Sequence, residues 1–392
     1  MEYLEPALRT YPWGSRTMLA ELRGTESPAP TPEAELWFGA HPAAPSTVGG
    51  RSLHDVIEED PVAALGARVA DASGGELPFL VKLLAAGEPL SIQAHPSKAQ
   101  AVEGFERENE QGIALDDPRR NYKDANHKPE LIVALTPFRA LAGFRPTHLT
   151  RELFDVLGPL ERYSALLSGD DPQESLRAVF TTLISLPAGL RVALLGGVEV
   201  SARELIAGGA ADWMFEVAET FLQLSERYPG DVGALVALML NHVTLAPGEA
   251  LFLGAGQPHA YLHGLGVEVM ANSDNVLRGG LTSKHVDVPE LARVLDFTAL
   301  SDPRVAAAEV ESGCEYQLPI DEFRVSRHPL AGGATLAVDN DGPAVVLCTA
   351  GRIRLGGLEI APGAAVWVPA SAEACVVELA GQEPAEVFLV RV

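Results

Sequence analysis

The stretch Ser91-Ile92-Gln93-Ala94-His95-Pro96 decides the fold prediction, because it contains two potential metal ligands, Gln93 and His95, that are separated by a single residue. It follows an apolar run over 77–84, and the side chains of an extended strand alternate between its two faces. Gln93 and His95 therefore point to the same face, with Ser91 beside them. The proline at the end of the stretch offers no backbone donor and ends the strand. Two polar side chains on one face of an apolar strand predict partners elsewhere in the chain.

Length and composition predict a folded protein of several domains with an acidic surface. The chain has 392 residues, which is too long for one ordinary core, so two or three domains are expected. A hydrophobic content of 47% with 21% charged residues excludes a disordered chain. The formal net charge of -24 predicts no binding to nucleic acid or to an anionic membrane. An anionic substrate would therefore need a local group of cations.

The cysteines and the N-terminus predict a cytoplasmic location. The three cysteines, Cys314, Cys348 and Cys375, are widely spaced and form no Cys-x-x-Cys pair. This pattern favours neither a disulfide framework nor a thiolate metal site. Residues 1–6 lack the basic and apolar regions of a signal peptide, and no apolar run is long enough to span a bilayer. We therefore expect a cytoplasmic protein, and we expect a monomer.

Apolar periodicity separates a helical block from the strands on either side of it. Before residue 149 the pattern predicts strands at 79–84 and 131–135 and helices at 53–69 and 99–110. Between 149 and 240, apolar residues recur at three- and four-residue spacing, which predicts helices at 151–167, 173–186, 202–206, 213–227 and 231–240. Asp231 is the expected N-cap of the last helix. From about residue 315, short apolar strands alternate with Gly and Pro turns, as in an antiparallel sandwich.

Three glycine-spaced patterns resemble the motifs of cupin barrels. The first covers 87–95, with glutamine where histidine is usual, and the second covers 248–259. Their glycines permit the positive φ angles of tight barrel turns. The third covers 363–374 and has Ala374 at the position that matches His259, so it lacks that metal ligand. The repetition predicts two barrels, of which only the first binds a metal.

The predicted fold is mainly β with an α-helical insertion: two cupin (jelly-roll) β-barrels plus a helical domain. The catalytic cupin combines residues 1–148 with residues 242–314 and is discontinuous, because the helical domain at 149–241 is inserted into it. The C-terminal cupin spans 315–392 and is free of metal.

The candidate metal ligands are Gln93, His95, Glu130 and His259. Both histidines occupy the ligand positions of the cupin motifs. Glu130 directly precedes an apolar strand, where a buried carboxylate needs a partner. Imidazole and carboxylate ligands suit zinc, and also iron or manganese. We expect one Zn²⁺ per chain, with other divalent metals as alternatives.

Several blocks of sequence closely resemble the type I mannose-6-phosphate isomerases, a family of the cupin superfamily. The blocks are 91–96, Asn126-His127-Lys128-Pro129-Glu130, Gln257-Pro258-His259-Ala260-Tyr261, 272–282, Tyr228-Pro229-Gly230-Asp231 and Tyr11-Pro12-Trp13-Gly14. Their order and spacing agree with the family over nearly the whole chain. One departure is Pro12, where many relatives carry an acidic residue.

The resemblance implies a zinc enzyme that interconverts D-mannose 6-phosphate and D-fructose 6-phosphate. It also implies the four ligands above and an active-site role for Arg278. Such an aldose–ketose isomerase moves a proton between C2 and C1 through an enediol intermediate. It needs a base and a means of stabilising negative charge on the sugar oxygens. Zinc can act as a Lewis acid or can position the sugar, and the sequence leaves both roles open.

Four residues are candidates for catalytic roles: Arg278, Glu268, Lys128 and His41. Glu268 is the first choice of base, because its strand is apolar and burial raises the pKa of a carboxyl group. The alternative for Glu268 is a barrel-wall carboxylate paired to a lysine. His41 and His127 are further candidates for the base, and His127 could instead orient the group that transfers the proton.

The substrate phosphate needs cations and hydrogen-bond donors. Arg278 and Lys284 flank a Gly-Gly turn, and Lys128 lies two residues before a metal ligand. Arg278 could instead stabilise the enediolate, and the sequence does not separate these two roles. The substrate-binding candidates are Ser91, Lys284, Tyr261, Trp13 and His127.

Two other functions compete with the isomerase. His95, Glu130 and His259 alone form the two-histidine, one-carboxylate set of non-haem iron dioxygenases. Gln93 as a fourth ligand argues against it, because oxygen chemistry needs open metal positions. The other possibility is a sugar-binding cupin without catalysis, but a binding protein needs no buried base. Neither would have a nucleic acid or a membrane as partner.

Overall fold

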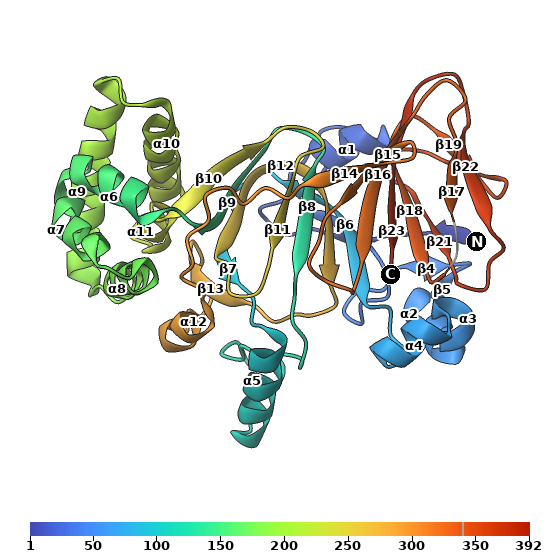
Figure 1. The fold of residues 1–392 in the computed structure, drawn as a ribbon, viewed down its shortest axis with the longest axis horizontal. Coiled ribbons are helices and arrows are strands. Elements are labelled where there is room, and N and C mark those ends of the chain that lie inside the picture. The colour runs from blue at the N-terminus through green and yellow to red at the C-terminus, as the bar shows by residue number, and fades with distance from the viewer. Residues whose placement is uncertain (339–340) are drawn as a thin grey trace.

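The structure, a computed structural model, describes residues 1–338 and 341–392. It has three parts along its longest axis: helices at one end, a 10-stranded sheet in the middle and the C-terminal strands at the other end (Figure 1). The helices lie between two strands of the central sheet in the sequence. The predicted fold class, β-sheets with an inserted helical segment, is confirmed.

The 10-stranded sheet draws its strands from both sides of the helical segment. It contains β2 (Ala7–Arg9), β3 (Glu35–Phe38), β6 (Phe79–Ala86), β7 (Ile92–Ala94), β8 (Glu130–Ala134), β9 (Phe138–Phe144), β10 (Leu240–Leu245), β11 (Ala250–Leu253), β12 (His259–Ala271) and β13 (Leu277–Gly280). The first part of β12, residues 259–263, pairs with β7 and β9, and the second part, residues 264–271, pairs with β6 and β8. One long strand thus joins the two walls of a barrel.

Gly264 lies where β12 changes partners. Its φ is +133°, and a Cβ there would lie 2.7 Å from the ring of Phe138. Only glycine adopts this conformation readily. The close approach of the two strands therefore depends on a residue without a side chain.

The helices between β9 and β10 agree with the predicted helical block in type but differ in extent. They are α6 (Thr147–Val156), α7 (Glu161–Ser164), α8 (Pro172–Ile184), α9 (Ala188–Ala207), α10 (Asp212–Arg227) and α11 (Gly233–Ala237), with 3₁₀ turns at Gly158–Leu160 and Ala165–Ser168. Helix α9 is longer than the predicted 202–206. Its exposed apolar residues Leu190, Val192 and Val200 blur the periodicity on which the prediction relied.

Two predicted helices are wrong in their details. The expected helix at 231–240 is only α11, whose N-cap position is Val232 and not Asp231, and the chain enters β10 at Leu240. The expected helix at 53–69 is three short helices, α2 (Leu53–Glu59), α3 (Pro61–Leu65) and α4 (Ala67–Ser73). The breaks fall at Pro61, which has no amide donor, and at Gly66, whose φ is +78°.

The C-terminal strands form two further sheets. The 7-stranded sheet contains β1 (Glu2–Leu4), β14 (Ala307–Val310), β15 (Gly313–Tyr316), β16 (Arg324–Leu330), β18 (Ala344–Ala350), β21 (Ala365–Val368) and β23 (Ala385–Arg391), and the 4-stranded sheet contains β17 (Leu336–Val338), β19 (Ile353–Leu355), β20 (Leu358–Ile360) and β22 (Cys375–Leu379). The 7-stranded sheet thus includes the N-terminal strand of the chain. The elements that remain are α1 (Met18–Arg23), β4 (Thr47–Val48), β5 (Arg51–Ser52), α5 (Lys98–Glu110) and α12 (Val288–Val294).

A shared apolar core fixes the central sheet against the 7-stranded sheet. Leu36 and Val267 from the central sheet belong to the same buried cluster as Val345 and Phe388 from the C-terminal strands. Burial of large apolar side chains on this scale stabilises the junction. The strands that carry the site described below therefore rest on a rigid support.

No single helix in the described ranges is long and apolar enough to cross a bilayer. Helices α8 and α9 reach the required length and composition only together, and they are bent by 109° at the break between them.

Candidate metal centre and active site

Three buried side chains meet inside the barrel of the central sheet. His95 directly follows β7, Glu130 opens β8 and His259 opens β12. The strand register sets His259 opposite Gln93. One possible ligand atom from each of the three residues lies within 4.8 Å of the others. Segments far apart in the sequence thus converge at one point.

The Nε2 atoms of both histidines face one carboxylate oxygen. His95 Nε2 lies 3.4 Å and His259 Nε2 lies 3.3 Å from Glu130 Oε2. On the other edge of each ring, Nδ1 of His95 lies 2.7 Å from the carbonyl oxygen of Asn275, and Nδ1 of His259 lies 3.0 Å from that of Gln257. A carbonyl oxygen can only accept, so each Nδ1 carries the proton and donates. This leaves a lone pair on each Nε2.

This arrangement fits a metal ion. Burial lowers the pKa of His95 to about 4, so the ring is neutral, and its Nε2 has no hydrogen-bond partner in the described parts of the chain. A lone pair that faces a carboxylate oxygen in a buried site is unfavourable unless a cation lies between them. Hydrogen bonds from Nδ1 to carbonyl oxygens are those that orient histidine ligands in metal sites. The orphaned His95 Nε2 is the observation that favours a metal.

Lys128 keeps the Glu130 carboxylate charged. Its Nζ lies 3.0 Å from Glu130 Oε1, the oxygen that does not face the histidines. Burial raises the pKa of Glu130, but the charge of Lys128 outweighs it and holds the pKa well below its usual range. A charged carboxylate with one free oxygen is the form that binds a divalent cation.

Gln93 and Ser91 lie beside this centre on β7 and just before it. The side-chain Nε2 of Gln93 donates to Ser91 Oγ at 3.3 Å. The amide oxygen of Gln93 makes no hydrogen bond within the described residues, which leaves it available as a fourth ligand. Ser91 is thus placed to orient the glutamine.

A second buried group of charges lies next to the metal candidates. Lys82 on β6 is opposite Glu268 on β12, and its Nζ lies 2.8 Å from Glu268 Oε2 and 3.6 Å from Glu35 Oε1. Burial raises the pKa of Glu268, although Lys82 opposes the shift. Burial alone lowers the pKa of Lys82, but the charges of Glu268, Glu35 and Glu130 together raise it. Glu268 is therefore a carboxylate paired to a lysine, and the charge of Glu130 is near enough to act on it.

Replacing Lys82 with methionine is expected to lower the free energy of unfolding by about 3–5 kcal/mol, because both carboxylates then lose their buried cation. Denaturant unfolding of the metal-free protein measures this free energy. Lys98→Met is the control, since the only hydrogen-bond partner of exposed Lys98 within residues 1–338 and 341–392 is Asn126 Oδ1, and the substitution should change the free energy of unfolding by less than about 0.5 kcal/mol. An unchanged unfolding midpoint in Lys82→Met would contradict the ion-pair account.

Tyr261 brings a hydroxyl group to the same interior. It follows His259 by two residues on β12, with ring centroids 6.2 Å apart. Its buried hydroxyl has no hydrogen-bond partner among the residues described. Burial, followed by the charges of Glu268 and Glu130, raises its pKa well above the ordinary value. The hydroxyl therefore stays protonated and can donate to a ligand.

Three cations form a group beside the metal candidates. Arg278 on β13 lies opposite Gln93, and burial lowers its pKa. Burial also lowers the pKa of Lys284, and the nearby charges of Arg278 and Lys123 lower it further. No ion pair of these three side chains is found in residues 1–338 and 341–392. Unpaired cations that lie together in a chain of net charge -24 indicate an anion-binding site.

His41 lies at the wall of a cavity of about 670 Å³ that it shares with Lys123, Asp124 and Asp274. Its Nδ1 accepts a hydrogen bond from the Ala43 amide at 3.2 Å, so its Nε2, 3.6 Å from Asp274 Oδ1, carries the proton. Burial lowers the pKa of His41, so its ring is neutral at pH 7.

The other two predicted residues are engaged with the protein. His127 pairs through Nε2 with Glu322, which comes from the C-terminal part of the chain. Trp13 is half-buried, stacks on Tyr11 with centroids 5.7 Å apart, and packs against the apolar cluster that includes Tyr261. Both side chains therefore contribute to contacts around the barrel.

Three residues of this site were not assigned by the sequence analysis: Lys82, Glu35 and Lys123. A signal existed for Lys82, because a single lysine inside the apolar run 77–84 must be buried and needs a carboxylate. Lys123 gave no signal in the sequence, since only the path of its loop brings it near Lys284.

Comparison with known proteins gives consistent matches. The family model described as "Phosphomannose isomerase type I, catalytic domain" matches residues 1–147. The mannose-6-phosphate isomerase of Escherichia coli strain K12 is 41% identical over 384 residues, which cover 95% of each chain. The mannose-6-phosphate isomerase of Homo sapiens is 35% identical over 374 residues, covering 86% of this chain and 85% of the human one.

Solved structures agree over the full length. A crystal structure of mannose 6-phosphate isomerase bound with zinc and yttrium has a TM-score of 0.88 and 36% identity, covering 100% of this chain and 99% of that chain. The apo form of mannose 6-phosphate isomerase from Salmonella typhimurium has the same TM-score and identity, 0.88 and 36%, and covers 100% and 98% of the two chains.

Proposed function

The chain belongs to the type I mannose-6-phosphate isomerase family, and from this premise we propose that it interconverts D-mannose 6-phosphate and D-fructose 6-phosphate with one Zn²⁺ per chain. The observation that carries the proposal is the buried group of His95, Glu130 and His259 next to an unpaired group of cations. A metal centre beside an anion site suits a phosphorylated sugar.

Zinc would be held by His95, Glu130 and His259, with the amide oxygen of Gln93 as the fourth ligand. When bound, zinc can polarise the oxygens on C1 and C2 of the sugar or fix their position. The chain already prepares the ligand geometry, because backbone carbonyls orient both imidazole rings.

Arg278, Lys284 and Lys123 would bind the phosphate. Arg278 offers a planar fork of donors that suits phosphate, and the two lysines add charge. Because Arg278 pairs in register with Gln93, the phosphate and the metal would lie on adjacent strands. The sugar would then extend between them, with its reacting carbons toward the ligand strand.

Glu268 remains the proposed base. Burial raises its pKa toward the range in which a carboxylate transfers protons efficiently, while Lys82 holds it in place. The Tyr261 hydroxyl and the Lys128 ammonium are donors for the negative charge that develops on the sugar oxygens. His41, with its protonated Nε2 at the neighbouring cavity, is the alternative in the proton transfer.

A dioxygenase has less support, because its chemistry uses no phosphate-binding cations and the relatives are isomerases. The monomeric state, the cytoplasmic location and the absence of nucleic-acid or membrane partners stay predictions of the sequence.

Product analysis tests the proposal. The zinc-loaded protein is expected to convert mannose 6-phosphate into fructose 6-phosphate, followed by NMR of the sugar carbons, without consuming oxygen at an electrode. Oxygen uptake in the iron-loaded protein, with no isomerisation by either metal form, would favour the dioxygenase instead.

A further inference from the structure

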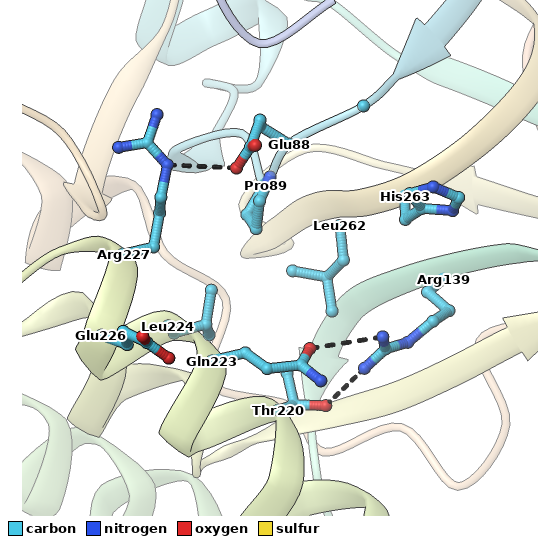
Figure 2. Close-up of a pocket in the computed structure, with 11 residues that line it drawn as sticks. Glu88, Pro89, Arg139, Thr220, Gln223, Leu224, Glu226, Arg227, Leu262 and His263 are labelled. Carbon is cyan, nitrogen blue, oxygen red and sulfur yellow. Dashed lines mark hydrogen bonds and ion pairs between the residues drawn. The ribbon is translucent and has the colours of Figure 1, made fainter. Parts of the chain in front are cut away.

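The turn at residues 228–233, between α10 and α11, contacts the chain next to both strands that carry the site. The hydroxyl of Tyr228 donates to the carbonyl oxygen of Pro89 at 2.6 Å, two residues before Ser91. Beside it, Arg227 Nε donates to Glu88 at 3.1 Å, a contact drawn in Figure 2 at the edge of a surface pocket. The other end of the turn touches the loop that follows β13.

That second contact is made by Asp231. Its Oδ1 accepts hydrogen bonds from the amides of Gly233 at 2.7 Å and Leu281 at 2.9 Å, and its Oδ2 accepts from Thr282 at 3.1 Å. Two of the three donors therefore belong to the loop after β13 and not to the helical segment. Bonds from amides to a charged carboxylate are stronger than neutral ones. A local turn at the start of α11 accounts only for the bond from Gly233.

The loop that Asp231 holds has an unusual conformation. Leu281 has a φ of +56°, and among the described residues only Ser312 shares a positive φ without being glycine. A branched side chain adopts this region only when the surroundings impose it. The Asp231 carboxylate, bonded to the Leu281 amide, is part of what imposes it.

Two glycines let the backbones touch at this point. A Cβ on Gly233 would lie 2.5 Å from the Leu281 nitrogen, and a Cβ on Gly280 would lie 2.5 Å from the Gly233 Cα. The start of α11 and the end of β13 thus pack backbone against backbone. Any shift of the turn is passed directly to the loop.

We propose that Asp231 is a positioning residue that shapes the 280–282 loop so that Arg278 and Lys284 meet the substrate phosphate. The inference rests on the proposed function. Arg278 lies two residues before the held loop and Lys284 two residues after it, and no ion pair with another described residue fixes either side chain. Instead of such ion pairs, the hydrogen bonds of Asp231 fix the loop between the two cations. The helical segment thereby acts on phosphate recognition without contacting the substrate.

Asp231→Ala removes all three bonds and is expected to lower kcat/KM for mannose 6-phosphate about 100-fold, the usual effect of a misplacement of roughly 1 Å at a binding group. The inhibition constant of inorganic phosphate should rise in parallel, while zinc content stays at the wild-type value. Asp231→Asn keeps one acceptor oxygen and should lose about tenfold. If the alanine variant does not fold, the asparagine variant and its phosphate inhibition decide the question.

A mutant cycle separates positioning from general destabilisation. If Asp231 acts through Arg278 and Lys284, adding Asp231→Ala to the variant Arg278→Ala/Lys284→Ala should lower its kcat/KM by no more than about threefold. If the losses in kcat/KM multiply and the inhibition constant of inorganic phosphate is unchanged in Asp231→Ala, the proposal is wrong.

Asp171→Ala is the matched control. Asp171 also accepts two backbone amides, from Gln173 at 2.9 Å and Glu174 at 3.3 Å, but it does so at the start of α8. The kcat/KM of the Asp171→Ala variant should stay within about twofold of wild type, as expected for a surface substitution away from the site. Wild-type kinetics in Asp231→Ala would refute the positioning role and leave the proposed function standing. A wild-type protein that turns over no mannose 6-phosphate would refute the function instead.

Discussion

Replacing Glu130 with glutamine is expected to weaken zinc binding by about 10²- to 4 × 10³-fold and to reduce turnover in proportion at limiting zinc. Glutamine keeps the shape of the side chain but removes the charge that faces both imidazoles and Lys128. Removing one partner of a buried charge group costs roughly 3–5 kcal/mol, and each 1.4 kcal/mol is about tenfold in affinity. Competition with a chromophoric chelator measures the affinity.

Glu108→Gln is the matched control for this substitution. Glu108 is also a buried, ion-paired carboxylate, 3.0 Å from Arg120, but it lies on α5 outside the ligand group. The Glu108→Gln variant should be less stable than the wild type and should keep wild-type zinc affinity. Tight stoichiometric zinc in Glu130→Gln would show that the metal is held elsewhere.

Replacing Arg278 with alanine is expected to lower kcat/KM for mannose 6-phosphate by about 10³-fold with zinc content unchanged. Each charge-assisted hydrogen bond is worth about 1.5–3 kcal/mol, and a guanidinium can donate two of them to one phosphate. The half-buried guanidinium has no other partner within the described residues, so its loss should affect the substrate and not the fold. Steady-state kinetics and thermal unfolding test both halves of this statement.

Arg139→Ala serves as its control. Arg139 lies on β9 of the same sheet, but its guanidinium donates to Thr220 and Gln223 on α10 (Figure 2). The kcat/KM of the Arg139→Ala variant is expected to stay within about threefold of wild type. Equal losses in both variants would mean that Arg278 acts on the fold and not on the phosphate.

The sequence predicted the fold class and the grouping of His95, Glu130 and His259 because the motifs that carry these residues are local and resemble those of cupin barrels. Each histidine lies at a fixed distance from a turn glycine, and Glu130 lies at the start of an apolar strand. Strand alternation and turn chemistry then determine which face each side chain occupies. These rules act over a few residues, so they can be followed without knowing the fold.

The features that the sequence did not predict depend on contacts between distant segments. Lys82 meets Glu268 only because β6 pairs with β12 in one particular register. Asp231 looked like an N-cap because its nearest amide is local, whereas its other two donors lie in a loop about 50 residues further on. Periodicity carries no information about which strands pair or which loops meet.

The most direct test of the isomerase assignment is turnover of mannose 6-phosphate in a coupled assay, before chelation, after chelation and after zinc is restored. The account predicts that activity is lost to the chelator and returns with about one zinc per chain. A protein that binds one zinc per chain tightly and still shows no turnover would contradict it.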